Sequence, residues 1–280
     1  MSGLKSRRGA GLAEMIVALT LAAVVSIAGA TALTGAERYT RTARGAADAR
    51  RTLREAEAVL ALELRAAPFD SVRVRGDTAM DFLGYVGVSV VCVLSGNVLV
   101  LPPDVAAGGF PYSSWRAAPE AGDILAAFDT AGGVWRTAVV DTASTRTDGD
   151  GCEPSSGLLS AADSAARRPV TRVVLRSSLP PGVTIGSPVR VGRSARYALT
   201  KAADGSWSLS YRRCTGSSCG VAQPVVGPLA SPGDSGLVFA DIAAEARVSV
   251  RLRTPAPRPG APREAAVLRV ALRNRSTGAP

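Results

Sequence analysis

The sequence predicts an α+β fold in which a long N-terminal helix, membrane-spanning in its first half, packs on an antiparallel β-sheet domain. Three observations lead to this prediction. A run of 19 uncharged residues, 15–33, follows a short basic segment. Residues 37–67 are rich in Ala, Arg and Glu, which favour helices. From residue 68 onward, short stretches alternate apolar with polar residues and are separated by turn signals.

The apolar run is long enough to cross a bilayer. Its 19 residues would extend about 28 Å as a helix, close to the ~30 Å hydrocarbon core. The basic residues before it, Lys5, Arg7 and Arg8, place the N-terminus in the cytoplasm and the rest of the chain across the membrane. An uncleaved anchor and a secretory signal ending in the small residues 28–30 are alternatives. Neither of them gives a role to Glu14, the one charged residue between 10 and 36.

The helix is expected to continue beyond the membrane, as one unit from residue 11 to 67. Four apolar residues recur at helical spacing and form one stripe: Leu53, Ala56, Leu60 and Leu64. Pro68 ends the pattern. The stripe indicates packing against the domain that follows. Two helices, with a break near Gly35 or Gly45, are the alternative.

The remainder reads as one β domain. Expected strands cover residues 72–75, 84–94, 98–101, 124–129, 134–140, 171–176, 195–200, 206–211, 247–253 and 266–272. Asp204-Gly205 is a hairpin turn signal between two of them. Long loops are expected at 102–122, 141–169 and 212–236.

The composition argues against an enzyme. The chain has no histidine, which excludes Ser-His-Asp and Cys-His nucleophiles. Residues 233–236, Gly-Asp-Ser-Gly, copy a serine-protease motif, but without a general base they are read as a turn. The acidic segment 148–153 is read as a polar turn, with calcium binding as the alternative. No cofactor is expected.

The four cysteines suit an oxidising compartment. Cys214 and Cys219 enclose four residues, a spacing that fits a local disulfide at a hairpin end. Cys92 and Cys152 would then pair by elimination. A four-cysteine metal site is the alternative, although the chain lacks the two closely spaced cysteine pairs that such sites prefer.

The net charge of +10 comes almost entirely from arginine. Most arginines fall on alternating strand positions, which indicates a solvated surface. Two clusters, Arg212 with Arg213 and Arg258 with Arg263, would reach DNA phosphates or anionic lipid. Aromatic residues make up only 5% and no stacking platform is visible. Nucleic acid is therefore only a minor alternative partner.

Residues 7–19, RRGAGLAEMIVAL, resemble the N-terminal signature of type IV pilins and pseudopilins. The resemblance implies that a prepilin peptidase cuts after Gly9 and that Ala10 becomes the methylated first residue. Glu14 is then the fifth residue of the mature chain. In this family the Glu14 carboxylate pairs with the N-terminal amine of a neighbouring subunit. Ala10 stands where the family most often has Phe.

The C-terminal half adds to this resemblance. Tyr197 and Leu199, followed by Leu209 and Arg212, are similar to a hairpin of large minor pilins and J-type pseudopilins. Arg212 follows Leu209 by three residues, where the family has two.

The resemblance implies four segments: a leader over 1–9, a transmembrane and filament-core helix over 10–36, its continuation over 37–67, and a periplasmic pilin domain over 68–280. The implied function is that of a structural subunit which initiates or caps a type IV pilus or a type II secretion pseudopilus.

The implied partners are other pilin or pseudopilin subunits, prepilin peptidase, the inner-membrane assembly platform and membrane lipid. The implied location is the bacterial inner membrane, with the C-terminal domain in the periplasm, and then the filament. The alternative is a membrane-anchored periplasmic β-domain that binds a ligand and joins no filament.

Overall fold

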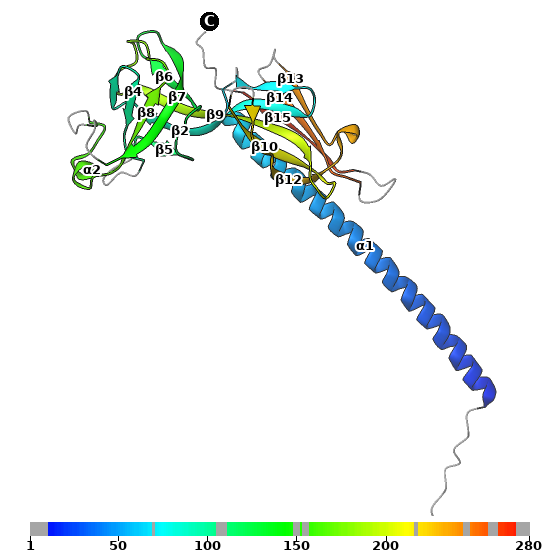
Figure 1. Ribbon diagram of the computed structural model, residues 1–280. Coiled ribbons are helices and arrows are strands. Elements are labelled where there is room, and N and C mark those ends of the chain that lie inside the picture. Colours follow the sequence, from blue (N-terminus) through cyan, green and yellow to red (C-terminus); the bar gives the residue numbers. More distant parts are fainter. Residues whose placement is uncertain are drawn as a thin grey trace, which may run out of the picture.

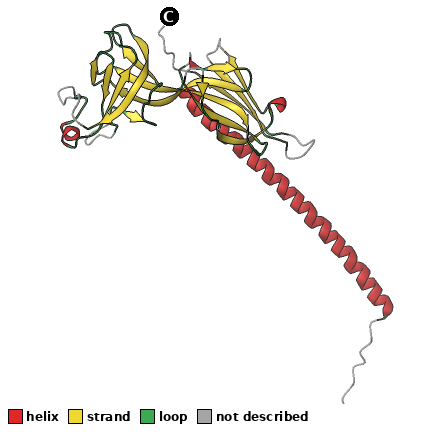
Figure 2. Cartoon of the chain, viewed as in Figure 1, coloured by secondary structure: helices red, strands yellow, loops and turns green. Residues whose placement is uncertain are grey.

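The computed structural model describes residues 11–68, 71–104, 111–147, 152, 157–215, 218–242, 247–256 and 263–272. A long N-terminal helix leads into antiparallel sheets (Figure 1). Beyond that helix, strands and loops make up nearly all of the drawn chain (Figure 2). The predicted α+β layout is confirmed.

Helix α1 runs without a break from Leu12 to Ala66, a length of 55 residues and about 82 Å. The alternative of two helices is wrong, since Gly35 and Gly45 both lie within the continuous helix. Ala67 is already extended, with φ −70° and ψ 139°. Pro68 explains this end because proline disfavours helical geometry in the residue before it.

Fifteen strands follow the helix in the described part of the chain. Those of the larger sheet are β1 (Arg73–Arg75), β2 (Ala79–Val90), β3 (Val93–Ser95), β4 (Val98–Leu101), β5 (Ser114–Trp115), β6 (Ile124–Asp129), β7 (Val134–Arg146), β8 (Val170–Leu175), β9 (Pro188–Lys201), β10 (Trp207–Thr215), β11 (Ser218–Cys219) and β12 (Gln223–Leu229). The smaller sheet contains β13 (Leu237–Ile242), β14 (Arg247–Arg253) and β15 (Ala265–Ala271). Two short helical segments are α2 (Ala161–Ala165) and the 3₁₀ turn η3 (Pro232–Asp234).

Strand β9 organises the larger sheet. Along residues 188–198, one edge of β9 pairs with the whole of β2. The other edge pairs with two strands in turn: residues 189–192 with β6, and residues 195–201 with β10. The sheet therefore forks at Arg193 and Ser194, and the two branches carry separate groups of strands (Figure 1).

Two large hydrophobic cores lie on the two branches of this fork, and a small third cluster surrounds Cys92 and Cys152. The helix lobe buries the end of α1 against the near ends of β2 and β9, together with β10, β12 and the smaller sheet. The distal lobe buries the far ends of β2 and β9 against β4, β6, β7 and β8. Residues 68–280 were expected to form one β domain. Their burial is instead divided, because β2 and β9, with 12 and 14 residues, are long enough to enter both lobes.

The stripe predicted on α1 is confirmed. Leu53, Ala56, Leu60 and Leu64 are at most 4% exposed and belong to the core of the helix lobe. Their spacing places them on one face, and the two sheets cover that face.

Each of the three expected long loops contains regular structure. Strand β5 lies within 102–122, and the end of β7 and helix α2 lie within 141–169. The segment 212–236 contains the end of β10 and all of β11 and β12. Strand β12 was not predicted from the sequence, because most of its residues are exposed and it contains Pro224 and Pro228. It pairs only with β10 among the described strands, and proline is typical of such edge positions.

Two disulfides use all four cysteines. Cys214 and Cys219 lie opposite each other on β10 and β11, and the bond closes that hairpin. Cys92, between β2 and β3, is joined to Cys152, 60 positions further along the chain. No cysteine is free, so the alternative of a four-cysteine metal site is wrong.

Candidate functional site: the exposed half of helix α1

The first half of α1 is a largely apolar surface that no described residue outside the helix covers. Every described residue from 12 to 44 is exposed. Leu12, Val25 and Leu33 are 80%, 69% and 69% exposed. By length and composition the segment is a candidate membrane span. A continuous apolar surface of this size requires lipid or protein around it.

The hydroxyl groups of this segment are satisfied within the helix. The hydroxyl of Thr20 donates to the carbonyl of Val17 at 2.9 Å, and that of Ser26 donates to Ala22 at 2.7 Å. Thr31 and Thr34 bond back to the preceding turn in the same way. In a bilayer, or among packed helices, polar groups need partners of this kind because water is absent.

Glu14 lies in the first turn of α1 and is exposed. Its Oε2 accepts a hydrogen bond from the backbone N–H of Gly11 at 3.2 Å. A carboxylate at a helix N-terminus is favourable because the first N–H groups carry a partial positive charge. No ion pair to Glu14 occurs within the described part of the chain. The carboxylate is thus available to a cation from another molecule.

Gly9 and Ala10, the predicted cleavage and methylation positions, lie outside the described residues. The acidic segment 148–153, predicted to be a polar turn, also lies outside the described residues apart from Cys152, and so does Arg258.

The buried end of α1 carries one carboxylate, Glu63, which is 6% exposed. It accepts a hydrogen bond from the guanidinium of Arg116. Tyr197 and Tyr211 pack edge to face beside it, with ring centroids 5.7 Å apart. Burial and the charge of Glu63 raise the pKa of both phenols, so both stay neutral.

The predicted β9–β10 hairpin is confirmed. Tyr197 lies opposite Tyr211 and Leu199 opposite Leu209, and all four side chains belong to the core of the helix lobe or pack against it. Gly205 takes φ +85° in the turn, as the Asp-Gly signal predicted. The hairpin shares this core with α1, while the strands that lie closest to the helix are β2, β12 and β15.

An ion-pair network at the fork was not predicted from the sequence. Arg193 donates from Nε and Nη2 to the two oxygens of Asp123, at 2.7 and 2.8 Å. Asp123 is 1% exposed. Glu120 accepts from Arg213, which lowers the pKa of Glu120. These pairs tie the segment before β6 to β9 and β10. All four residues lie outside the strands expected from the sequence, so no local pattern pointed to the network.

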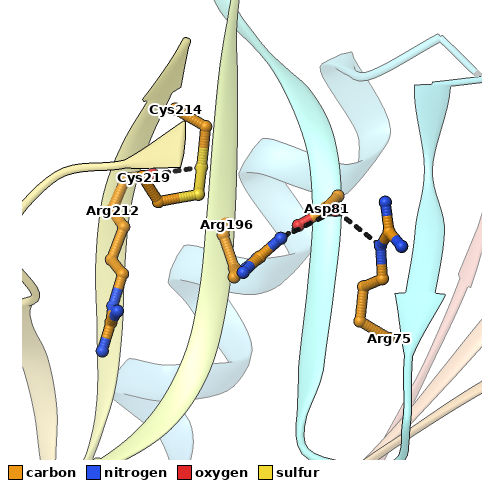
Figure 3. Close-up of a disulfide and its surroundings, with 6 residues drawn as sticks. All are labelled: Arg75, Asp81, Arg196, Arg212, Cys214 and Cys219. Atoms are coloured by element: carbon orange, nitrogen blue, oxygen red, sulfur yellow. Dashed lines mark hydrogen bonds and ion pairs between the residues drawn. A yellow bond between two sulfur atoms is a disulfide. The ribbon is translucent and has the colours of Figure 1, made fainter. Parts of the chain in front are cut away.

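Arg212 and Arg213 were expected to form one basic cluster, but on strand β10 their side chains have different surroundings. Arg213 pairs with Glu120, whereas the Nε of Arg212 is buried without a partner among the described residues. Figure 3 shows Arg75 and Arg196 converging on Asp81, while Arg212 extends away from that carboxylate. Successive residues of a strand point to opposite faces, so the two neighbours do not form one basic patch.

The protease-like motif forms a turn, as predicted. Pro232–Asp234 is the 3₁₀ turn η3, and Ser235 follows with φ 55°. Asp234 accepts a hydrogen bond from Ser231 at 3.0 Å and pairs with Arg263 at 2.8 Å. The Arg263 charge is therefore partly neutralised within the chain.

Comparisons with protein-family models, with curated proteins and with solved structures find no match to this chain.

Proposed function

We propose that this protein is a structural subunit of a filament of the type IV pilus or type II secretion class, a minor pilin or pseudopilin. One observation carries the proposal. The unbroken helix α1 is divided into a fully exposed apolar half with Glu14 at its start and a second half that forms part of a β-domain core. The exposed apolar half of such a helix can span the membrane before assembly and can pack against the same helix of neighbouring subunits in the filament.

The proposed assembly begins with insertion, the N-terminus remaining in the cytoplasm. A prepilin peptidase removes residues 1–9 and methylates Ala10. Glu14 then exchanges its hydrogen bond from Gly11 for the charged amine of a neighbouring subunit. In a low-dielectric helix bundle such a pair offsets the cost of burying both charges and sets the axial register between subunits.

The proposed position in the filament is its tip. The distal lobe adds a second β core to the one on which α1 lies. A subunit enlarged in this way fits more easily at an end, where neighbours lie on one side only, than within a shaft. The inner-membrane assembly platform and other pilin-like subunits are the proposed partners.

The decisive experiment is the intact mass and N-terminal sequence of the membrane-extracted protein, produced with an active or an inactivated prepilin peptidase. The proposal expects a chain that begins at methylated Ala10 only with the active enzyme. A matched Gly9→Leu variant should stay uncut. A chain that begins at Thr31 would indicate a secreted protein. An intact N-terminus with the active peptidase would favour the membrane-anchored binding module.

A further inference from the structure

One face of the larger sheet carries a row of charged residues that crosses four strands. Arg73 on β1 lies directly opposite Asp81 on β2. Asp81 lies opposite Arg196 on β9, which in turn lies opposite Arg212 on β10. Directly opposed residues of paired strands project from the same face. Tyr197, the next residue on β9, belongs to the core shared with α1, so these four residues, the arginine row, lie on the face turned away from the helix.

The positive charge of the arginine row is not neutralised within the chain. Asp81 is its one carboxylate, and it already accepts hydrogen bonds from Arg196 and from Arg75, which lies beside the row on β1. Arg73 and Arg212 make no ion pair within the described residues. With Arg75 included, four guanidinium groups surround one carboxylate, which leaves a net charge of +3 on this face.

Arg196 and Arg212 are like charges in directly opposed positions. Their strands lie about 4.8 Å apart, and such a pair is destabilising without a counter-charge. Figure 3 shows Arg196 turned toward Asp81 and Arg212 turned away from it. The other positions around Arg212 on this face are uncharged: Ser210 and Cys214 on β10, Ser194 and Ala198 on β9, and Pro224 on β12. The arrangement therefore calls for an anion from another molecule.

Both guanidinium groups can reach such an anion. The Nε of Arg212 is buried without an acceptor among the described residues, which shows that the side chain lies against the sheet. Its two Nη groups also make no hydrogen bond there, but they are not buried. The Arg196 side chain is 29% exposed. It donates to Asp81 from Nε and Nη2, so its Nη1 is left for a ligand.

These donors select the chemistry of the ligand. A guanidinium group only donates hydrogen bonds, and its planar fork fits carboxylate and phosphate oxygens. A carboxylate brings one negative charge, whereas a phosphomonoester brings about 1.5–2 near pH 7 and three acceptor oxygens, enough for two guanidinium groups at once. Tyr197 and Tyr211 point into the core or pack against it. The described part of the row therefore offers no ring on which a nucleic-acid base could stack.

We propose that Arg196 and Arg212 bind a phosphate dianion, either free phosphate or a phosphomonoester, with Arg73 adding positive charge. Lipid headgroups are an unsuitable source. Even Leu53, the first residue of α1 in the helix-lobe core, lies about 30 Å along the helix beyond Leu33, where the uncharged run ends. The row thus lies beyond the reach of the membrane that α1 would span. The inference holds whether or not the chain joins a filament.

The test follows the Nε–H signal of Arg212 by NMR in the full chain, labelled with ¹⁵N-arginine, in dodecyl maltoside micelles and a buffer free of phosphate and sulfate. Burial protects this proton from exchange with water, and an Arg212→Gln variant identifies its signal. The probes are inorganic phosphate, methyl phosphate and glucose 6-phosphate at constant ionic strength. We expect each to shift the signal saturably. Tighter binding of glucose 6-phosphate would identify a phosphorylated organic molecule as the source, and equal binding of all three would identify free phosphate.

Two variants remove one guanidinium group each. Arg212→Gln and Arg196→Gln should each weaken the binding of methyl phosphate about fivefold or more, as measured from the ³¹P line width of the probe. Arg251→Gln removes the same charge from an exposed position on β14 in the smaller sheet, so it is the matched control and should bind as the native chain does. Arg212→Gln should not lower the denaturant midpoint, because it breaks no side-chain bond of the described fold and relieves the repulsion from Arg196.

The proposal is overturned if none of the three probes gives a saturable shift, or if Arg251→Gln weakens binding as much as Arg212→Gln does. It is also overturned if acetate or the monoanion dimethyl phosphate shifts the Arg212 signal at the same concentrations as methyl phosphate. An oligonucleotide that moves the signal while the monoesters do not would overturn it in favour of a polyanion held by charge alone.

Discussion

The carboxylate of Glu63 on helix α1 and the guanidinium of Arg116 after strand β5 form a hydrogen-bonded ion pair that joins the helix to the distal lobe. Glu63 is buried, and the Arg116 side chain is half exposed. The backbone N–H of Arg116 also donates to the carbonyl of Val86 on β2 at 2.8 Å. Arg116 therefore connects α1 and β2 through two separate hydrogen bonds.

Removing the carboxylate should weaken this connection. We expect Glu63→Ala to lower the free energy of unfolding by about 1.5–3 kcal/mol, the range for a hydrogen bond to a charged group. The measurement is denaturant unfolding of the full chain in micelles. The matched control is Glu55→Ala on the same helix, which breaks an exposed pair with Arg51 and should leave the midpoint unchanged. Equal losses in both variants would contradict the role assigned to Glu63.

Glu14→Ala should leave membrane insertion intact and abolish incorporation into the filament, because the exposed apolar half of α1 is unchanged while the partner of the N-terminal amine is lost. The measurement is the amount of the protein in sheared filaments, relative to the amount in the membrane fraction. Glu37→Ala, further along the exposed helix and paired only with Arg41 at the surface, is the control and should assemble normally. If Glu14→Ala assembles as well as that control, the proposed pairing is wrong.

The two disulfides should contribute unequally to stability. Loop-closure entropy predicts about 4 kcal/mol for Cys92–Cys152, which spans 60 residues, and about 2 kcal/mol for Cys214–Cys219, which spans 5. We expect the Cys92→Ser/Cys152→Ser variant to unfold at lower denaturant than the Cys214→Ser/Cys219→Ser variant. Reducing both disulfides of the native chain before unfolding should lower its denaturant midpoint at least as far as the Cys92→Ser/Cys152→Ser substitution does. The reverse order of the two variants would show that the short loop has a role beyond closure.

Two glycines should respond oppositely to alanine. At Gly87 a Cβ would lie 2.1 Å from the Trp115 ring and 2.6 Å from the carbonyl of Ser114, so Gly87→Ala should cost about 1–3 kcal/mol through overpacking. At Gly45, inside α1, nothing lies within 4 Å, so Gly45→Ala should stabilise the helix by up to about 1 kcal/mol. Thermal unfolding followed by circular dichroism measures both. A loss at Gly45 would indicate that this part of the helix bends in solution.

Stability should fall below about pH 4 partly through Asp81. Partial burial raises the pKa of its carboxyl, but hydrogen bonds from Arg196 and Arg75 outweigh burial and hold that pKa below its usual value. A depressed folded-state pKa contributes stability that is complete above the unfolded value of about 3.9 and is lost as the pH falls through the folded value. Asp81→Asn should therefore reduce the difference in unfolding midpoint between pH 7 and pH 3. The exposed Asp48→Asn is the control, and an unchanged difference in Asp81→Asn would contradict this account.

Sequence reasoning succeeded where a local pattern is sufficient. The uncharged run, the apolar stripe ending at Leu64 and the position of Pro68 determine one helix with one buried face. The hairpin around Gly205 follows from turn chemistry in the same way. These features depend on residues within a few positions of one another, so spacing alone reveals them.

The fork at β9 and the two cores depend on contacts between distant residues. Arg193 meets Asp123 across 70 positions and Arg116 meets Glu63 across 53. The spacing of nearby residues does not predict such pairs. Edge strand β12 also lacks the alternation of apolar and polar residues from which a strand is predicted. The sequence alone determined which part of the chain is a candidate membrane span and which face of the helix is buried, since both follow from the polarity of nearby residues. The pairing of strands determined the division into lobes, because burial there depends on which distant segments come together.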